Sequence, residues 1–252
     1  MLDYSISQRC RQYFSGIPVA QKLYDVIRLT FRPTYFEDGL LTVHNSDFLT
    51  DRKFRKAYDR ALQQQDGLRI QWRAHVTQWA GQHASNLEGD YVECGVNRAF
   101  LSTSVMTYID FDSMQDRKFF LFDTFSGLVK EQITDADKAA YRNKYEDCYE
   151  FVCQSFKDKE NVIIVRGIVP DSLPTVDIDK VAYLSIDMNC AEPEESALKY
   201  FWPKLVNGAV VILDDYGFPA HEAQKIVADK FASSVDVEVL TLPTGQGLII
   251  KP

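Results

Sequence analysis

The sequence of 252 residues lacks the patterns that mark several common protein classes. It has no G-x-G-x-x-G run, so the fingerprint of dinucleotide-binding folds is absent. Its five cysteines are scattered, odd in number and without the paired spacing of a zinc site, which favours buried or free thiols. No cluster of Lys and Arg stands out and the net charge is −8, so the basic face that binds nucleic acid is missing. We therefore expect no nucleic-acid partner.

Long hydrophobic runs are also missing. No uninterrupted apolar stretch approaches the roughly 20 residues that span a bilayer. The first ten residues, MLDYSISQRC, do not have the character of a signal peptide. We therefore expect a cytoplasmic protein with no membrane partner, and the sequence leaves a homodimer open.

Short apolar runs alternate with stretches of helical spacing over most of the chain. Strands are predicted at 90–94, 118–122, 161–165, 181–186 and 209–213, and two β-rich runs at 235–240 and 247–250 suggest a terminal antiparallel hairpin. Helices are predicted at 17–30, 52–64, 68–86, 99–109, 134–157 and 220–233, and around the apolar stripe of Leu198, Phe201, Trp202 and Leu205. This alternation predicts an α/β fold with a mostly parallel sheet.

The helical pattern before residue 68 belongs to a different part of the chain. We expect residues 1–67 to form an N-terminal helical extension that acts as a substrate lid, and residues 68–252 to form the main domain. In the helix at 68–86, Ile70, Ala74, Trp79 and Ala80 are expected near one face. Arg73 lies off that stripe, where it either is solvated or lines a cleft.

Acidic residues end two of the predicted strands. Asp187 follows the strand at 181–186, and Asp214 and Asp215 follow the strand at 209–213. Open α/β sheets bind ligands outside the carboxyl ends of their strands, so these side chains are expected to converge. Three carboxylates so close together repel one another unless a cation lies between them. Asp residues that merely cap the following loop are the alternative.

A glycine turn and a further acid follow the first two strands of the main sheet. Gly95 lies between a strand and a helix, which allows a ligand to approach the backbone at the helix N-terminus. Asp123 ends the next strand, where α/β folds bind the hydroxyls of a ribose. A plain turn-capping role for Asp123 is the alternative.

These motifs together resemble the class I S-adenosylmethionine-dependent methyltransferases, and more narrowly the macrocin O-methyltransferase (TylF/MycF/NovP-related) group. The resemblance rests on Tyr91-Val-Glu93-Cys-Gly95-Val, on Phe122-Asp123-Thr-Phe-Ser-Gly127-Leu, and on Tyr200-Phe-Trp-Pro203-Lys204-Leu205 with Asp214-Asp215-Tyr216. It implies a Rossmann-like, seven-stranded, mostly parallel sheet with helices on both faces and a C-terminal antiparallel hairpin. It also implies S-adenosylmethionine as the cofactor and a small-molecule acceptor.

The resemblance assigns expected roles to the cofactor residues. Glu93 and Gly95 would lie against the methionine portion, while Asp123, with Thr124 beside it, would hold the ribose hydroxyls. The region from Gly167 to Asp171 would lie near the adenine, and Asp187 would also face the cofactor.

The resemblance further implies a divalent metal ion, usually Mg²⁺, held by Asp187, Asp214 and Asp215. The ion would bind adjacent oxygens of a sugar or similar acceptor and lower the pKa of the hydroxyl that attacks the sulfonium methyl group. One departure from the group is visible, because its usual Asp-x-Asp is Asp187-Met188-Asn189 here. Asn189 can offer a carbonyl oxygen but neither a charge nor a base.

The identity of the general base and of the acceptor contacts is less constrained. His221, together with Asp187, is the expected catalytic residue, since a neutral imidazole suits proton removal near pH 7; a surface histidine at a helix end is the alternative. Asn189, Tyr216, His44 and Arg73 are expected to contact the acceptor.

Three functions remain open from the sequence. The first is a metal-assisted O-methyltransferase that acts on a hydroxyl of a sugar-containing or natural-product small molecule. The second is a metal-independent N- or C-methyltransferase, and the third is a noncatalytic binding module on the same fold.

Overall fold

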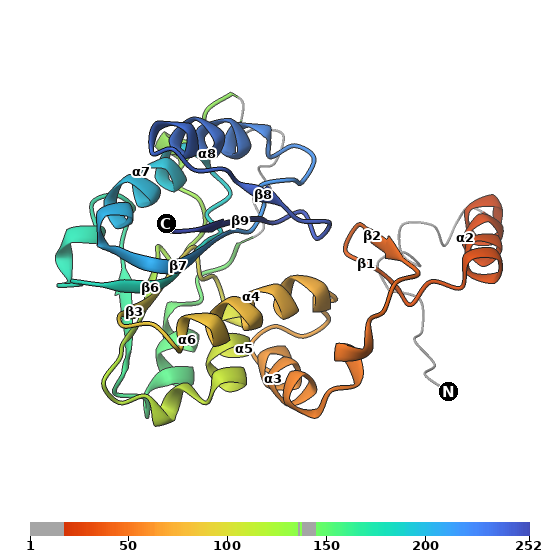
Figure 1. Cartoon of the computed structure of the whole chain (residues 1–252), viewed down its shortest axis with the longest axis horizontal. Coiled ribbons are helices and arrows are strands. Elements are labelled where there is room, and N and C mark those ends of the chain that lie inside the picture. Colours follow the sequence, from red (N-terminus) through yellow and green to blue (C-terminus); the bar gives the residue numbers. More distant parts are fainter. Residues whose placement is uncertain (1–17, 136, 138–144) are drawn as a thin grey trace.

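The computed structural model describes residues 18–135, 137 and 145–252 of the chain. Two sheets are present in this part: a two-stranded hairpin and a seven-stranded sheet in the order β5-β4-β3-β6-β7-β9-β8 (Figure 1). The strands are β1 (Tyr35–Glu37), β2 (Leu40–Thr42), β3 (Asp90–Cys94), β4 (Phe119–Asp123), β5 (Val162–Arg166), β6 (Val181–Ile186), β7 (Leu205–Leu213), β8 (Leu240–Thr241) and β9 (Gly247–Ile250). The α-helices are α2 (Pro18–Phe31), α3 (Arg52–Leu62), α4 (Gln71–Ala84), α5 (Phe100–Ile109), α6 (Tyr149–Phe156), α7 (Ala191–Phe201) and α8 (Glu222–Ser234).

The large sheet confirms the predicted architecture. Strands β5, β4, β3, β6 and β7 pair in parallel, while β9 pairs antiparallel with both β7 and β8. The chain runs outward from β3 to β5 and then returns to place β6 on the other side of β3. The strand order therefore reverses between β3 and β6, which is where open α/β sheets bind their ligands.

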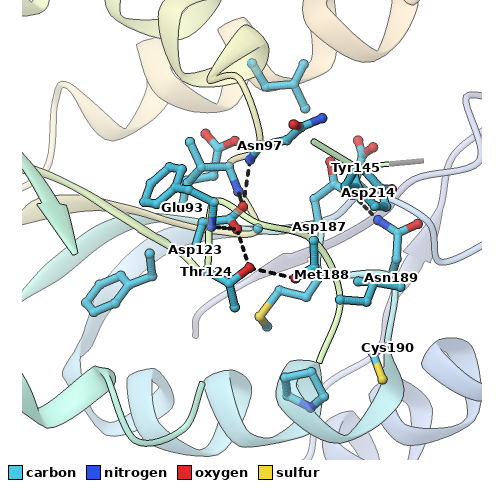
Figure 2. Close-up of a pocket in the computed structure, with 18 of the residues that line it drawn as sticks. Glu93, Asn97, Asp123, Thr124, Tyr145, Asp187, Met188, Asn189, Cys190 and Asp214 are labelled. Atoms are coloured by element: carbon cyan, nitrogen blue, oxygen red, sulfur yellow. Dashed lines mark hydrogen bonds between the residues drawn. The ribbon is translucent and has the colours of Figure 1, made fainter. Parts of the chain in front are cut away.

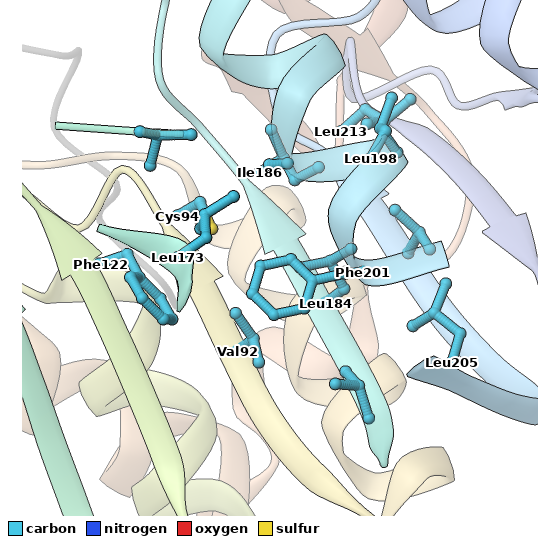
Figure 3. Close-up of a cluster of buried hydrophobic side chains, with 14 of the residues drawn as sticks. Val92, Cys94, Phe122, Leu173, Leu184, Ile186, Leu198, Phe201, Leu205 and Leu213 are labelled. Carbon is cyan, nitrogen blue, oxygen red and sulfur yellow. The ribbon is translucent and has the colours of Figure 1, made fainter. Parts of the chain in front are cut away.

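Alternating side chains of the strands build two hydrophobic layers. Val92, Phe122 and Leu184 face α7 and α8, and pack with Leu198 and Phe201 in the cluster drawn in Figure 3. Their neighbours in the strands, such as Tyr91 and Leu121, face the opposite side and pack against α4, α5 and α6. The period of two residues along each strand thus buries both faces of the sheet under helices.

The N-terminal region adds a third cluster. Phe54 and Tyr58 of α3 pack with Ala74 of α4 and Phe100 of α5. Asp51 caps α3, because its carboxylate accepts a hydrogen bond of 2.8 Å from the amide of Phe54. In Figure 1 the hairpin β1–β2 and helix α2 lie beyond α3, on the right of the view.

The structure corrects four predictions about the elements. Residues 145–148 are not helical, so the helix predicted at 134–157 contributes only α6 among its described residues; residues 136 and 138–144 lie outside them. Trp79 is exposed, because the buried face of α4 consists mainly of small residues such as Ala80 and Gly81. Leu205 starts β7 rather than extending α7, since Pro203 lies in the 3₁₀ turn Trp202–Lys204 between them.

The fourth correction concerns the strand predicted at 235–240. Residues 235–239 are not a strand, and β8 contains only Leu240 and Thr241. The β1–β2 hairpin was not predicted, because its strands of three residues are too short to show a period. None of the helices that the structure describes has the length and apolar character needed to cross a bilayer.

Candidate active site

A cavity of about 370 Å³ opens at the carboxyl ends of the central strands. Figure 2 shows Glu93, Asp123, Asp187 and Asp214 around it. These residues lie in β3, in β4, directly after β6 and directly after β7. The four strands are hydrogen-bonded neighbours, so residues far apart in sequence share one site at the predicted edge of the sheet.

The turn after β3 forms the floor of the cavity and requires glycine. Gly95 has φ +88°, and a Cβ built there would lie 2.0 Å from the carbonyl oxygen of Asp187. The amide of Asp187 in turn donates a hydrogen bond of 2.8 Å to the carbonyl of Cys94. The turns after β3 and β6 are therefore pressed together, and only a residue without a side chain fits between them.

Asp123 ties the turn after β3 to the end of β4. Its Oδ2 accepts hydrogen bonds from the amides of Val96 (2.6 Å) and Asn97 (2.7 Å). Its Oδ1 accepts one from the amide of Phe125 at 2.7 Å and a longer one of 3.3 Å from the hydroxyl of Thr124. The turn-organising role that the sequence left open is therefore present, and both Asp123 and Thr124 line the cavity.

Glu93 is a deeply buried acid of the cavity wall. It is 1% exposed, and one of its carboxyl oxygens accepts a hydrogen bond of 2.5 Å from Ser102. Burial raises the pKa of Glu93 to about 8, with further repulsion from Asp214 and Asp123 and an opposing effect of the Ser102 hydroxyl. Glu93 is therefore largely protonated at neutral pH in the absence of a cationic partner.

The three acids predicted to converge do so. One oxygen from each of Asp187, Asp214 and Asp215 lies within 4.8 Å of the others; we call these residues the acidic triad. Burial and the neighbouring carboxylates raise the pKa of Asp187 well above its ordinary value and that of Asp215 to about 7. Ionisation of all three carboxyl groups at neutral pH is unfavourable unless a cation offsets their repulsion.

Two further side chains hold Asp214, which is only 1% exposed. Gln246 donates a hydrogen bond of 2.8 Å to Oδ1, and Arg73 donates a short one to Oδ2. The same guanidinium lies 4.0 Å from Asp215 and binds Asp38 of the β1–β2 turn through Nε at 2.7 Å. Arg73 therefore lines the cavity, which is one of the two positions that the sequence left open for it.

The loop after β6 carries the departure from Asp-x-Asp. Asn189 has φ +57°, lines the cavity, and its amide nitrogen lies 3.3 Å from Oδ1 of Asp187. Rotating the side-chain amide of Asn189 by 180° would exchange its nitrogen and oxygen, so that the carbonyl oxygen would face Asp187 instead. Glu194 of α7 supports this loop from beneath, because it accepts a hydrogen bond of 3.2 Å from the amide of Met188.

Several expected site residues lie elsewhere. Gly167 lines the cavity, but Asp171 is exposed and does not. His44 is exposed in the segment after β2. Tyr216 is buried in the core, where its hydroxyl contacts Asp229 and Lys225 of α8.

His221 occupies an intermediate position. It precedes α8, does not line the cavity, and its Nδ1 lies 3.4 Å from Oδ2 of Asp215. The same nitrogen lies 3.2 Å from the side-chain amide of Gln224. His221 therefore reaches the acidic triad from the side of α8, through Asp215.

Other residues of the site carry no signal in the sequence. Gln246 binds the triad directly and Asp38 is linked to it through Arg73, while Tyr145 lines the cavity from the segment before α6. Gln132 also lines the cavity, and its side chain donates a hydrogen bond of 2.6 Å to the carbonyl of Val169. No spacing or motif in the sequence marks these residues, because each reaches the site from a segment far away in the chain.

Comparison with known proteins agrees with this geometry. Residues 74–239, more than half of the chain, match the macrocin-O-methyltransferase (TylF) family. Demethyldecarbamoylnovobiocin O-methyltransferase of Streptomyces niveus is 27% identical, and the match covers 63% of this chain and 64% of the relative. This chain thus aligns with less than two thirds of that enzyme's length.

Solved structures show the same fold. The O-methyltransferase NovP superimposes with a TM-score of 0.62 at 25% identity, covering 71% of this chain and 79% of NovP. A calicheamicin methyltransferase superimposes with a TM-score of 0.58 at 16% identity over 97% of this chain and 90% of its own. The motifs of the acidic triad and the Gly95 turn lie inside the matched family region. The chain therefore belongs to the macrocin-O-methyltransferase (TylF) family of methyltransferases.

Proposed function

We propose that this protein is an S-adenosylmethionine-dependent, divalent-metal-assisted O-methyltransferase acting on a hydroxyl of a sugar-containing or other natural-product small molecule. The observation that carries the proposal is the convergence of the acidic triad with the Gly95 turn and Asp123 on one cavity. Such a cavity offers a cofactor subsite on one side and a set of hard oxygen ligands on the other.

The residues around the Gly95 turn fit the cofactor. Gly95 lines the cavity without a side chain, and buried Glu93 is suited to receive a cationic ammonium group. Oδ2 of Asp123 already accepts two amides, whereas Oδ1 accepts one amide and the weaker 3.3 Å contact of Thr124. A ribose hydroxyl would replace that weaker contact.

The acidic triad fits a hard divalent cation. Three carboxylate oxygens within 4.8 Å of one another match the oxygen-rich sites that Mg²⁺ occupies with additional waters. Burial and the neighbouring carboxylates raise the pKa of Asp187 and of Asp215, so a bound cation would favour their ionised forms. When bound, such an ion lowers the pKa of a coordinated hydroxyl and orients it.

The chain's own residues divide the remaining tasks. Asp187 lies between the Gly95 turn and the other two acids, so it is placed to orient both the cofactor and the acceptor. Asn189 cannot accept the hydroxyl proton. We assign proton removal to a relay that ends at His221: a carboxylate oxygen of Asp215 takes the hydroxyl proton and passes it to Nδ1 of His221, which lies 3.4 Å from Oδ2, with a triad carboxylate alone as the alternative base.

The names of the relatives suggest the acceptor class. The relative from Streptomyces niveus and NovP are named as O-methyltransferases, the former for demethyldecarbamoylnovobiocin. We extend to this chain only the shared element, transfer to a hydroxyl of a natural-product small molecule. The lid role of residues 1–67 is part of the same proposal, since Gln65 already lines the cavity.

The experiment is a turnover assay with S-adenosylmethionine and a panel of glycosylated acceptors that carry adjacent hydroxyls. We expect S-adenosylhomocysteine to form, to stop on addition of a chelator, and to resume with Mg²⁺. Turnover indifferent to the chelator would support a metal-independent N- or C-methyltransferase instead. Failure to bind S-adenosylmethionine in calorimetry would indicate a noncatalytic binding module.

A further inference from the structure

A single guanidinium group connects the N-terminal hairpin to the acidic triad. Arg73 binds both oxygens of Asp38, through Nε at 2.7 Å and Nη2 at 3.2 Å. Its remaining nitrogen, Nη1, binds Oδ2 of Asp214 and lies 4.0 Å from Oδ1 of Asp215. The five-donor fork of arginine is therefore shared between the β1–β2 turn on one side and the triad on the other.

The surroundings of Arg73 keep it charged and in place. Its side chain is 16% exposed, that of Asp38 is 18% exposed, and the ring of Phe218 lies 5.0 Å from the guanidinium carbon. The negative charges of Asp214, Asp38 and Asp215 raise its pKa despite its burial. Arg73 thus supplies a permanent positive charge to a group of buried carboxylates.

The guanidinium of Arg73 lies beside carboxylate oxygens that a metal ion at the triad would bind. Oδ1 of Asp214 accepts Gln246 and Oδ2 accepts Arg73, so both oxygens of the most buried triad member already have partners. A divalent ion bound by Asp187, Asp214 and Asp215 would lie close to Nη1 and repel it. Displacing Arg73 from Asp214 would also disturb its hold on Asp38.

Asp38 is positioned to transmit this change. It lies in the two-residue turn between β1 and β2, has φ +54°, and is followed by Gly39 at φ +77°. The hairpin has a further tie to the segment just before α4, because Arg69 pairs with Glu37 at 3.4 Å. Unlike the ion pair of Arg69 with Glu37, the contact of Arg73 with Asp38 is linked to the triad, because Arg73 also binds Asp214.

We propose that Arg73 is an internal counter-cation that competes with the divalent ion for Asp214, so that metal binding loosens the β1–β2 turn from Arg73. The inference rests on the metal site of the proposed function and assigns Arg73 a positioning role rather than the acceptor contact that the sequence suggested. The order of the β1–β2 hairpin would then depend on whether the metal is bound.

The test compares Arg73→Met with the wild type and with Arg69→Met, in full-length protein saturated with S-adenosylhomocysteine. Arg69→Met removes the same charge and a tie to the same hairpin, but the tie is to Glu37. Calorimetry measures the affinity for Mg²⁺. Hydrogen–deuterium exchange measures the protection of the amides of residues 35–42 with and without Mg²⁺.

We expect Arg73→Met to bind Mg²⁺ about tenfold more tightly than the wild type, because one positive charge near the ion is removed. Arg69→Met should keep the wild-type affinity. In the wild type, Mg²⁺ should speed exchange in residues 35–42; in Arg73→Met, exchange should be fast from the start and unaffected by Mg²⁺. Asp38→Asn, a change in a partly exposed turn, should also abolish the response to Mg²⁺ if Arg73→Met does not fold.

The outcomes separate the inference from the proposed function. Equal Mg²⁺ affinity in Arg73→Met and wild type, or an unchanged hairpin when Mg²⁺ binds the wild type, would overturn the inference and leave the metal site intact. Absence of Mg²⁺ binding in both proteins would overturn the metal site and the inference with it.

Discussion

The side-chain amide of Gln246 donates a hydrogen bond of 2.8 Å to Oδ1 of Asp214, although 32 positions separate the two residues in the chain. Gln246 is fully buried at the start of the last hairpin strand, and Asp214 follows β7. The C-terminal hairpin therefore does more than extend the sheet, because it fixes the orientation of a triad carboxylate.

This relationship predicts the effect of Gln246→Leu. Loss of the hydrogen bond leaves a buried carboxylate oxygen without that donor, so the free energy of unfolding should fall by about 1–3 kcal/mol. The affinity for Mg²⁺ should fall too, since Arg73 alone would then fix the orientation of Asp214. Gln115→Leu is the matched control, because Gln115 is exposed and should change the free energy of unfolding by less than about 0.5 kcal/mol in urea denaturation. Equal effects of the two substitutions would contradict the assigned role.

Gly95→Ala tests the close approach of the turns after β3 and β6. The new Cβ would meet the carbonyl oxygen of Asp187 at 2.0 Å, and alanine is also strained at φ +88°. Gly39→Ala has a similar strain at φ +77° but no atom within 4 Å. We expect Gly39→Ala to cost about 1 kcal/mol from backbone strain and Gly95→Ala at least about 3 kcal/mol. Similar losses in thermal or urea unfolding would show that the turns are not packed as described.

The raised pKa of Glu93 predicts a dependence of stability on pH. In the unfolded chain Glu93 ionises near its ordinary value of 4.5, whereas in the folded protein it keeps its proton up to about 8. Between these values the folded state holds a proton that the unfolded state has lost, so raising the pH lowers the free energy of unfolding, by up to about 1.4 kcal/mol per pH unit.

Glu93→Gln isolates this effect, because glutamine can still accept the hydrogen bond from Ser102 without ionising. The variant and the wild type should be similarly stable near pH 5, and the variant should be the more stable of the two at pH 8. The measurement is urea unfolding of both proteins across this range without cofactor. A difference in stability that does not change with pH would refute the assignment to Glu93.

Asp123→Ala and Asp214→Ala should separate the two halves of the site. Asp123→Ala is expected to weaken S-adenosylhomocysteine binding by about tenfold or more, since it removes a charged hydrogen-bond acceptor and the anchor of the Gly95 turn. Asp214→Ala is expected to lower turnover by about a thousandfold while leaving cofactor binding nearly intact. Asp229→Ala, in α8 next to Tyr216, serves as a control that should keep normal turnover. Full turnover in Asp214→Ala would mean that the metal assignment is wrong.

The sequence predicted the parts of this protein that depend on local periodicity. The buried strands from β3 to β7 alternate or run apolar, and acidic residues follow β6 and β7, so the convergence of Asp187, Asp214 and Asp215 could be predicted. Family membership followed from the same motifs, and residues 74–239 confirm it.

The parts that escaped prediction depend on contacts between distant segments. Arg73 and Asp38 lie 35 positions apart, and neither carries a motif that would pair them. Tyr216 follows the acidic pair but turns into the core, because its hydroxyl finds Asp229 and Lys225 of α8. The helix predicted at 134–157 failed over 145–148, where Cys148 instead donates its amide to the carbonyl of Phe125 beside the cavity.

The most direct test of the central claim is a crystal structure with S-adenosylhomocysteine and Mn²⁺, read from the anomalous difference density. We expect one strong peak per chain, coordinated by carboxylate oxygens of Asp187, Asp214 and Asp215, with the ribose of the cofactor at Asp123. A cofactor-bound crystal with no peak at the triad, or with the ion held by other residues, would contradict it.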